Sequence, residues 1–200
     1  MSEKKIVEQR GLWFEEFETG VLYLHRPGRT ITEADNVLFT TLTMNTQALH
    51  LDAAFADALP PFNARLVNSM FTLSTLVGLS VAQLTQGTIV GNLASVKSRS
   101  RSHFFHGDTL YAESEVLDKR ESKSRPGGEG IVTFSHVGRN QHGDIVATAS
   151  RKTMVRKRGG RSIVAVTASG PAWLFCPRGP SRAVRKKAAA AADVVILDLE

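Results

Sequence analysis

A single histidine in a polar turn is the residue of this sequence best suited to chemistry. His50 follows Asn45 by five positions and Gln47 by three, between two short helix-like stretches and ahead of a long apolar segment. An imidazole that titrates near neutral pH can accept and return a proton, and a neighbouring carboxamide can orient a water molecule. A lone histidine is more often a helix cap or a hydrogen-bonded core residue, so the surrounding elements matter.

Predicted helices surround and follow His50. Thr32 and Asp35 form a capping-box-like start for a short helix. A second helix is expected from His50 to Ala58, where a proline pair ends it. Residues 66–84 are apolar on nearly every side of a helix and free of charge, but they hold too many polar residues for a membrane span. We therefore expect a buried central helix.

A run of predicted strands must enclose this helix, over residues 88–100, 109–119, 131–140 and 144–155. Residues alternate in two of these stretches as in antiparallel strands that have one solvent-exposed face. The first set is Leu110, Ala112, Ser114 and Val116, and the second is Ile131, Thr133, Ser135 and Val137. A long helix followed by a curved antiparallel sheet is an α+β fold. The sheet covers the helix on one side only, which favours a homodimer or a higher homo-oligomer.

Composition limits the class of protein. The 200 residues are 42% hydrophobic and 22% charged, which fits one globular domain with an appendage. The single cysteine, Cys176, excludes an internal disulfide, and the charged N-terminus lacks the apolar core of a signal peptide. We therefore expect a cytoplasmic protein that does not associate with membranes.

The formal net charge of +6 belongs to the C-terminal quarter. Residues 1–150 contain 14 basic and 16 acidic residues, whereas residues 151–200 contain 11 and 3. A nucleic-acid interface needs a basic face interleaved with aromatic residues on the folded body, so no nucleic-acid partner is expected. No metal site is expected either, because metal-ligand spacing is absent among His103, His106, His136 and His142.

The segment from Asn45 to Asp52, Asn-Thr-Gln-Ala-Leu-His-Leu-Asp, resembles the hydratase motif of MaoC-like dehydratases. These are relatives of the R-specific enoyl-CoA hydratases and have the hot dog fold, a long central helix wrapped by a curved antiparallel sheet. The resemblance covers about residues 11–158 and includes Thr32–Asp35 and Gly107–Leu110. It implies one hot dog domain over residues 1–158 that acts on an acyl-CoA thioester and needs no cofactor.

The family pattern is Asp-x-Asn-Pro-x-His, with the aspartate and the histidine as the catalytic pair. This chain has Asn45, Gln47 and Ala48 at the aspartate, asparagine and proline positions. An amide does not accept a proton as a carboxylate does, so His50 is expected to act as both general base and general acid while Asn45 orients the water or the substrate. The sequence Thr43-Met44-Asn45 resembles that of the mesaconyl-CoA or itaconyl-CoA hydratase branch of the family. This resemblance implies a branched or dicarboxylic 2-enoyl-CoA as the substrate.

The start of the central helix provides the second part of the implied mechanism. Addition of water to an α,β-unsaturated thioester builds enolate charge on the carbonyl oxygen, which a free N–H at a helix start can stabilise. Where the family usually has a glycine with such an N–H, this chain has Ser69, between Asn68 and Met70. The resemblance implies that these three residues and Gln47 bind substrate, and a simple N-cap role for Asn68 or Ser69 is equally compatible.

The residues after Arg158 have a different character. A glycine pair and a linker precede a strand, helix and strand pattern over residues 171–177, 181–191 and 193–200. The two strand segments resemble the start of citrate-lyase-beta-like (CitE) acyl-CoA lyases, without most of their β/α barrel. We expect residues 159–200 to be a linker and an incomplete fragment with no lyase activity. Such lyases cleave 3-hydroxyacyl-CoA thioesters, which suggests a pathway shared with a hydratase.

The prediction is therefore a hydratase of 2-enoyl-CoA thioesters, and two alternatives stay open. A hot dog thioesterase needs a carboxylate or a nucleophile facing the thioester carbon. Asp52 and Glu33 are the nearby candidates, and neither lies in a thioesterase-like motif. A noncatalytic acyl-CoA-binding protein is the other alternative, favoured by the absence of the family aspartate.

Overall fold

The structure is a computed structural model that describes residues 4–93, 97–99, 102–159, 173–176 and 194–197. They fall in two compact units, residues 1–160 and 161–200. The larger unit contains the short helices η1 (Phe14–Glu16), α1 (Glu33–Leu42), α2 (Ala48–Leu51) and α3 (Ala53–Asp57) and the long helix α4 (Ser69–Leu84). Its strands are β1 (Leu22–Thr30), β2 (Ile89–Asn92), β3 (Lys97–Arg99), β4 (Thr109–Glu121), β5 (Glu129–Arg139) and β6 (Ile145–Arg156).

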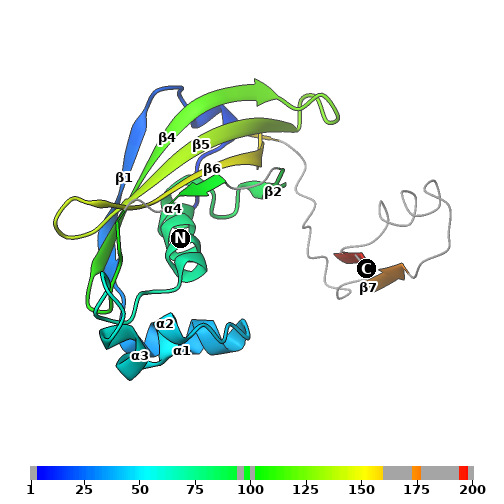
Figure 1. Ribbon diagram of the computed structural model, residues 1–200. Coiled ribbons are helices and arrows are strands. Elements are labelled where there is room, and N and C mark those ends of the chain that lie inside the picture. Colours follow the sequence, from blue (N-terminus) through cyan, green and yellow to red (C-terminus); the bar gives the residue numbers. More distant parts are fainter. Residues whose placement is uncertain (1–3, 94–96, 100–101, 160–172, 177–193, 198–200) are drawn as a thin grey trace. The chain divides into compact units, whose positions relative to one another are not determined.

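These strands form one antiparallel sheet in the order β1-β4-β5-β6-β2, and β3 pairs with another part of β6. Helix α4 packs against one face of the curved sheet, and α1 to α3 lie on the side of α4 away from the sheet (Figure 1). This is the α+β arrangement that the sequence predicts. The segment from α1 to α3 carries His50, so the fold brings this residue close to the start of α4.

The short helices begin where side chains cap them. The hydroxyl of Thr32 accepts the N–H of Asp35, and the carboxylate of Asp35 accepts the N–H of Thr32, which confirms the capping box of α1. The prediction of a single helix from His50 to Ala58 is wrong. The side chain of Asp52 accepts the N–H of Phe55 and starts a new helix, so α2 and α3 are separate.

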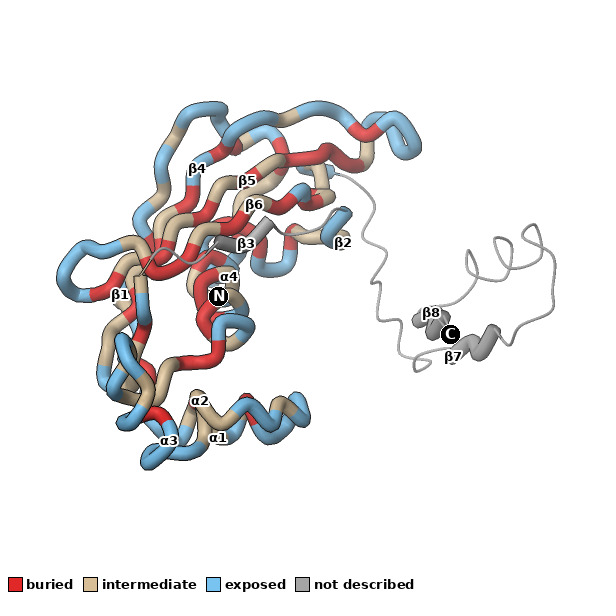
Figure 2. The backbone as a smooth tube through the Cα atoms, in the orientation of Figure 1, coloured by how far each residue is buried: buried red, intermediate tan, exposed pale blue. Residues whose placement is uncertain are grey.

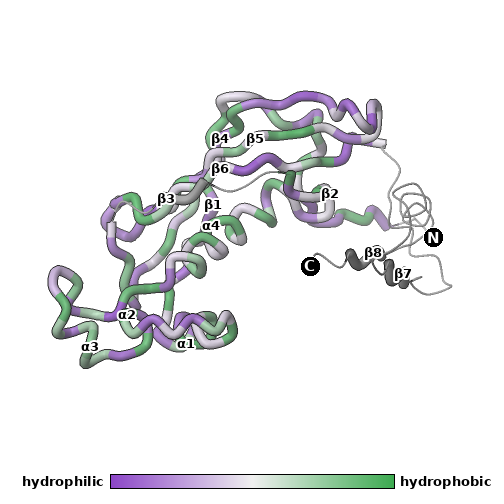
Figure 3. The backbone as a smooth tube through the Cα atoms, turned by 45° about the vertical axis from the view of Figure 1, so that its right-hand side comes forward, coloured by the Kyte–Doolittle hydropathy of each residue, from purple (hydrophilic) through white to green (hydrophobic). Residues whose placement is uncertain are grey.

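Helix α4 is buried on the side that faces the sheet (Figure 2). Leu76 and Leu84 are fully buried there. The other side is exposed at Met70, Ser74, Gly78 and Val81, although apolar residues recur along the whole helix (Figure 3). A single chain therefore covers the helix on one side only, as the sequence predicts.

The strands depart from the prediction in two places. The stretch expected as one strand over residues 88–100 contains two short strands, β2 and β3, which pair with successive parts of β6. Three residues of β5 lie on the α4 side of the sheet, because each pairs with an inward residue of β4. They are Phe134, His136 and Gly138. The alternating set found from the sequence, Ile131, Thr133, Ser135 and Val137, faces the opposite way, because a period of two does not say which face is inward.

The core of this unit has two apolar clusters. One contains Leu76, Leu110, Ala112 and Ala149, and the other contains Phe17, Leu84, Val116 and Phe134. On β4, the buried Ser114 lies between Ala112 of the first cluster and Val116 of the second. A layer of polar side chains therefore crosses the core between the clusters.

This polar layer is a continuous chain of hydrogen bonds. Arg151 Nε donates to His136 Nε2 over 3.0 Å, so the His136 proton resides on Nδ1, which lies 2.6 Å from Ser114 Oγ. Ser114 Oγ lies 2.8 Å from His25 Nε2, and His25 Nδ1 lies 2.8 Å from Gln83 Oε1. Each donor then meets one acceptor, from β6 across the sheet to α4, with both imidazoles neutral.

In the smaller unit, β7 (Trp173–Cys176) and β8 (Val194–Leu197) pair in parallel, so both expected strands are present. The helix expected over residues 181–191 lies outside the described residues, and the resemblance to CitE-like lyases stays a prediction. Across the described parts of both units, no helix has the length and apolar character needed to cross a membrane.

Candidate active site

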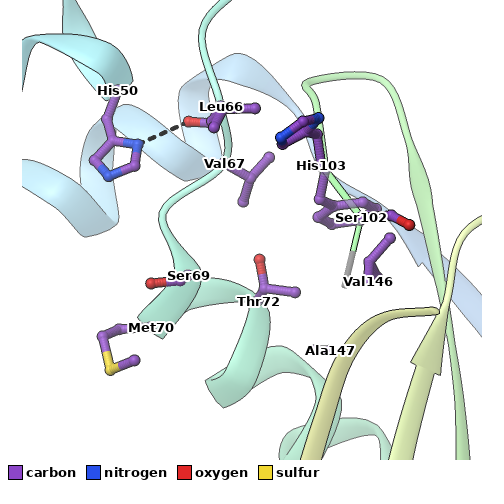
Figure 4. Close-up of a pocket in the computed structure, with 11 residues that line it drawn as sticks. His50, Leu66, Val67, Ser69, Met70, Thr72, Ser102, His103, Val146 and Ala147 are labelled. Atoms are coloured by element: carbon purple, nitrogen blue, oxygen red, sulfur yellow. Dashed lines mark hydrogen bonds between the residues drawn. The ribbon is translucent and has the colours of Figure 1, made fainter. Parts of the chain in front are cut away.

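A cavity of about 440 Å³ lies at the N-terminal end of α4 (Figure 4). Its described lining residues come from α2, α4, β6 and the segments before α4 and β4, and they are His50, Leu66, Val67, Ser69, Met70, Thr72, Ser102, His103, Phe104, Val146 and Ala147. The lining residues Val67, Phe104, Val146 and Ala147 are buried and apolar, whereas Ser69, Met70 and His103 are exposed at the rim. The cavity therefore has an apolar floor, and its rim carries the polar side chains of Ser69 and His103 beside the thioether of Met70.

His50 is held in one orientation by a backbone carbonyl. Its Nδ1 lies 3.0 Å from the carbonyl oxygen of Leu66, as the dashed line in Figure 4 marks. A carbonyl oxygen can only accept, so Nδ1 carries the proton of the neutral imidazole and donates it. The other nitrogen, Nε2, then has a lone pair available to remove a proton from a bound molecule. His50 is half-buried, in a wall of the cavity.

The carbonyl that holds His50 belongs to a segment fixed on both sides. Leu66 N donates to Leu49 O over 3.2 Å, and Leu66 also forms an isolated bridge with Phe105. Val67 N donates to Phe104 O over 2.8 Å. The segment before α4 therefore joins the short helix of His50 to the segment before β4.

Asn36 connects His50 to the start of α4, although sequence reasoning gave it no role. Its side chain is fully buried. Asn36 Nδ2 lies 3.3 Å from the carbonyl oxygen of His50 and 3.0 Å from His106 Nε2, and Asn36 Oδ1 accepts the N–H of Asn68 over 2.8 Å. One amide therefore fixes both the backbone of His50 and the N-cap of α4.

His106 completes this arrangement as a neutral acceptor. Burial lowers the pKa of His106 first, and the positive charge of Arg65 lowers it further, against the opposing effect of Glu33. A ring with a lowered pKa is neutral at pH 7, so its Nε2 can accept from Asn36.

The first turn of α4 leaves backbone donors available, and one of them belongs to a residue of the cavity lining. Asn68 is the N-cap, and its Oδ1 accepts the N–H of Met70 over 2.9 Å. Among the described residues, the N–H of Ser69 has no acceptor. The N-cap role and the free N–H therefore occur together, on adjacent residues, and Ser69 and Met70 line the cavity with His50.

Asn45 and Gln47 are not brought to the cavity lining. Asn45 Oδ1 accepts the N–H of Gln47 over 3.0 Å, and the carbonyl of Gln47 accepts the N–H of His50 over 3.0 Å. Gln47 is exposed and Asn45 is half-buried. The two residues therefore shape the turn that leads into α2 and carries His50.

His103 also lines the cavity, and sequence reasoning gave it no role in the site. It comes from the segment before β4, which reaches the cavity because residues 104 and 105 meet residues 66 and 67. A pairing between segments so far apart leaves no local signal in the sequence. The part of the chain that the structure describes holds no group of three or more His, Cys, Asp or Glu residues arranged for a metal ion.

Known proteins are similar to this chain over most of its larger unit. Residues 16–140 match the family model of the MaoC like domain. The chain is 34% identical over 148 residues to the beta-methylmalyl-CoA dehydratase of Chloroflexus aurantiacus, covering 74% of this chain and 41% of that protein. It is 32% identical over 150 residues to the mesaconyl-CoA hydratase of Cereibacter sphaeroides, covering 74% and 42%. The chain spans about two fifths of the length of these curated relatives.

The fold has solved counterparts as well. A Mycobacterium tuberculosis protein described as having a double hotdog fold superposes with a TM-score of 0.67, over 88% of this chain and 56% of that chain, at 20% sequence identity. This likeness confirms the hot dog fold that the sequence predicts.

Proposed function

The chain belongs to the family of MaoC-like domain proteins, and we propose that it adds water reversibly across the double bond of a 2-enoyl-CoA thioester. One observation carries the proposal. The cavity is lined both by His50, whose Nε2 is left with a lone pair, and by Ser69, whose N–H has no acceptor among the described residues. A proton acceptor and an oxyanion donor in one cavity are the two groups that this reaction needs.

In the proposed hydration, His50 Nε2 takes a proton from a water molecule and the water oxygen bonds to the β-carbon. The π electrons move to the thioester carbonyl, whose developing negative charge is stabilised by the N–H of Ser69 and by the N-terminus of α4. The imidazolium of His50 then returns its proton to the α-carbon. The reverse sequence expels water, and no other reactant is required.

The substrate class is proposed from the cavity and from the names of the relatives. The buried apolar side chains Val67, Phe104 and Val146 suit an alkyl branch of the acyl group. The relatives are named for beta-methylmalyl-CoA and mesaconyl-CoA. We therefore propose a branched or dicarboxylic enoyl-CoA.

Asn45 and Gln47 are proposed to act through the turn of His50. The hydrogen bonds from Gln47 N to Asn45 Oδ1 and from His50 N to Gln47 O support this role. An amide is sufficient for it, because the turn needs an acceptor and not a base. This role suits a chain in which asparagine occupies the family aspartate position.

The test is a hydration assay of the purified chain with crotonyl-CoA, mesaconyl-CoA and itaconyl-CoA, followed by the loss of enoyl absorbance. His50→Ala is expected to lower the rate at least about 10²-fold, the scale of general acid–base catalysis. His142→Ala is the matched control, because His142 is exposed and absent from the described cavity lining. An unchanged rate in His50→Ala would place the reaction elsewhere.

The same assay separates the two alternatives. Release of free CoA without loss of the double bond would identify a thioesterase. Saturable binding of crotonyl-CoA or mesaconyl-CoA with stable enoyl absorbance would identify a noncatalytic binding protein.

A homodimer or higher homo-oligomer is also proposed, as the state in which the open side of α4 is covered. The exposed residues Met70, Gly78 and Val81 on α4, and Leu38 and Leu42 on α1, support it. Light scattering of the purified chain tests this proposal, and a monomer at assay concentration would contradict it.

A further inference from the structure

The cavity has an uneven distribution of polar groups, which limits where a second carboxylate of the acyl group can lie. Val67, Phe104, Val146 and Ala147 are buried and apolar. Transfer of an ionised carboxylate onto such a surface without a partner is strongly unfavourable. A carboxylate carried by the acyl group must therefore meet a polar or charged side chain at the wall or the rim.

Two of the described lining residues have ionisable side chains, His50 and His103. His50 donates its Nδ1 proton to the carbonyl of Leu66 and needs its Nε2 for the proton transfer. His103 lies on the other side of Val67 from His50 (Figure 4). It is therefore the lining imidazole that is free to bind a second group.

The ring of His103 is held by aromatic contacts. It lies edge-to-face with Phe62, with ring centroids 4.8 Å apart and an interplanar angle of 88°, and 6.2 Å from the ring of Phe105. Among the described residues, neither of its ring nitrogens forms a hydrogen bond. An imidazole whose position is fixed by neighbouring rings, while its nitrogens have no protein partner, is ready to donate to a ligand.

We propose that His103 binds the second carboxylate of a dicarboxylic acyl-CoA and makes the cavity selective for enoyl thioesters that carry this group beside the double bond. This inference rests on the proposed function in one respect, that the acyl group occupies this cavity. A ring N–H of His103 donates to the carboxylate at the rim, while the alkyl branch lies on the apolar floor. His103 is a binding residue and takes no part in the proton transfer.

The experiment compares the binding of two saturated thioesters that differ in one carboxylate, freshly prepared succinyl-CoA and butyryl-CoA, to the full chain. His103→Phe keeps an aromatic ring beside Phe62 and Phe105 and removes both ring nitrogens. We expect it to weaken succinyl-CoA binding about tenfold or more, as for loss of a charge-assisted hydrogen bond, and to change butyryl-CoA binding less than threefold. His103→Gln retains an N–H donor and is expected to recover part of the affinity for succinyl-CoA.

Several results would overturn the inference. An equal loss of affinity for both thioesters in His103→Phe would indicate a packing role. Unchanged affinity for both thioesters in this variant would also contradict the inference. So would a wild-type chain that binds neither thioester or that prefers butyryl-CoA. His142→Phe serves as the control for histidine loss outside the cavity. The hydration assay is read separately. If the wild-type chain discriminates between the two thioesters through His103 but hydrates no enoyl-CoA, the proposed function fails and the carboxylate site stands.

Discussion

The side-chain oxygen of Asn36 accepts the backbone N–H of Asn68 over 2.8 Å, so a buried residue of α1 holds the first turn of α4. The amide nitrogen of the same residue reaches the carbonyl of His50 over 3.3 Å. The two groups proposed to do the chemistry, His50 and the N–H of Ser69, are therefore positioned by one side chain that touches neither the cavity nor the proposed substrate.

Replacement of Asn36 should separate positioning from stability. Asn36→Ala leaves the N–H of Asn68 buried without its partner, so we expect a loss of about 1–3 kcal/mol in the free energy of unfolding. We also expect kcat to fall at least tenfold with a smaller change in KM, because the reacting groups move while the rest of the cavity remains. Both parameters are measured with the enoyl-CoA that the wild-type chain hydrates fastest.

The control for this experiment is Leu76→Ala. Leu76 is fully buried in the core and absent from the described cavity lining, and its truncation costs about 2–5 kcal/mol. Assayed well below its melting temperature, Leu76→Ala should keep its kcat. Equal kcat losses in the two variants would mean that Asn36 acts through stability alone.

The turn before α2 allows a test of Asn45. Asn45→Asp keeps an oxygen that can accept the N–H of Gln47, whereas Asn45→Ala removes it. We expect Asn45→Ala to lose about 1 kcal/mol of stability, as for loss of a capping side chain, and to lower kcat through the displaced His50. Asn45→Asp should stay close to the wild-type melting temperature. Full activity of Asn45→Ala in the hydration assay would remove the proposed positioning role.

Much of the fold follows from local signals in the sequence. The capping pair Thr32 and Asp35 predicts the start of α1, and the apolar run over residues 66–84 predicts α4. The break between α2 and α3 was missed because one side chain, Asp52, makes it. The inward face of β5 was obscured because His136 lies on it, and a buried histidine looks like an exposed residue in a hydrophobic pattern.

The site was predictable only in part. The motif led to His50, and the helix start led to Ser69 and Met70, all three of which line the cavity. Asn36 and His103 carried no such signal. Their positions depend on contacts between segments that are distant in the sequence, such as the one from Asn36 to Asn68, and these contacts exist only after folding.

Gly11 fixes the N-terminal segment against the end of α4. Gly11 N donates to Gln86 O over 2.7 Å, and a Cβ at this position would lie 2.5 Å from the backbone nitrogen of Thr85. Backbone atoms cannot move aside as a flexible side chain can. Gly11→Ala should therefore destabilise the chain by roughly 1–3 kcal/mol in urea unfolding, as overpacking does.

Gly91→Ala is the matched control for Gly11→Ala. Gly91 lies within β2, and a Cβ there would meet nothing within 4 Å. Glycine inside a strand is less favourable than alanine by roughly 0.5–1 kcal/mol, so this variant should be at least as stable as the wild type. If both variants unfold at the same urea concentration, the close approach of the backbone at Gly11 does not determine the stability of the chain.

The chain of hydrogen bonds through His25 and His136 predicts how stability depends on pH. Burial, and then Arg151 and His25, lower the pKa of His136 to about 3. Burial likewise lowers the pKa of His25, against the opposing effect of the hydrogen bond that His25 donates to Gln83. Protonation of His136 Nε2 would place two donors face to face, because Arg151 Nε already donates to this atom. The folded chain therefore keeps both rings neutral.

The unfolded chain protonates His136 near its ordinary value of 6.5, whereas the folded chain does so only near 3. Between these values the unfolded state binds more protons, so the free energy of unfolding falls as pH falls, by up to about 1.4 kcal/mol per pH unit for this histidine. Carboxylates with lowered pKa values, such as Glu16, begin to add to the loss as the pH falls toward their ordinary value of 4.5, from about one pH unit above it. The slope between pH 6.5 and about 5.5 therefore belongs mainly to the histidines.

His136→Gln should reduce this slope, by an amount that corresponds to at most one bound proton. It should also lower the free energy of unfolding at pH 7, because the hydrogen bonds to Ser114 and Arg151 are disturbed. His142→Gln changes an exposed histidine and should leave the slope as in the wild type. Urea unfolding at half-unit pH steps gives the slopes directly. A His136→Gln slope equal to that of the wild type would show that His136 takes up a proton without unfolding, and the direction of the hydrogen-bond chain would then be incorrect.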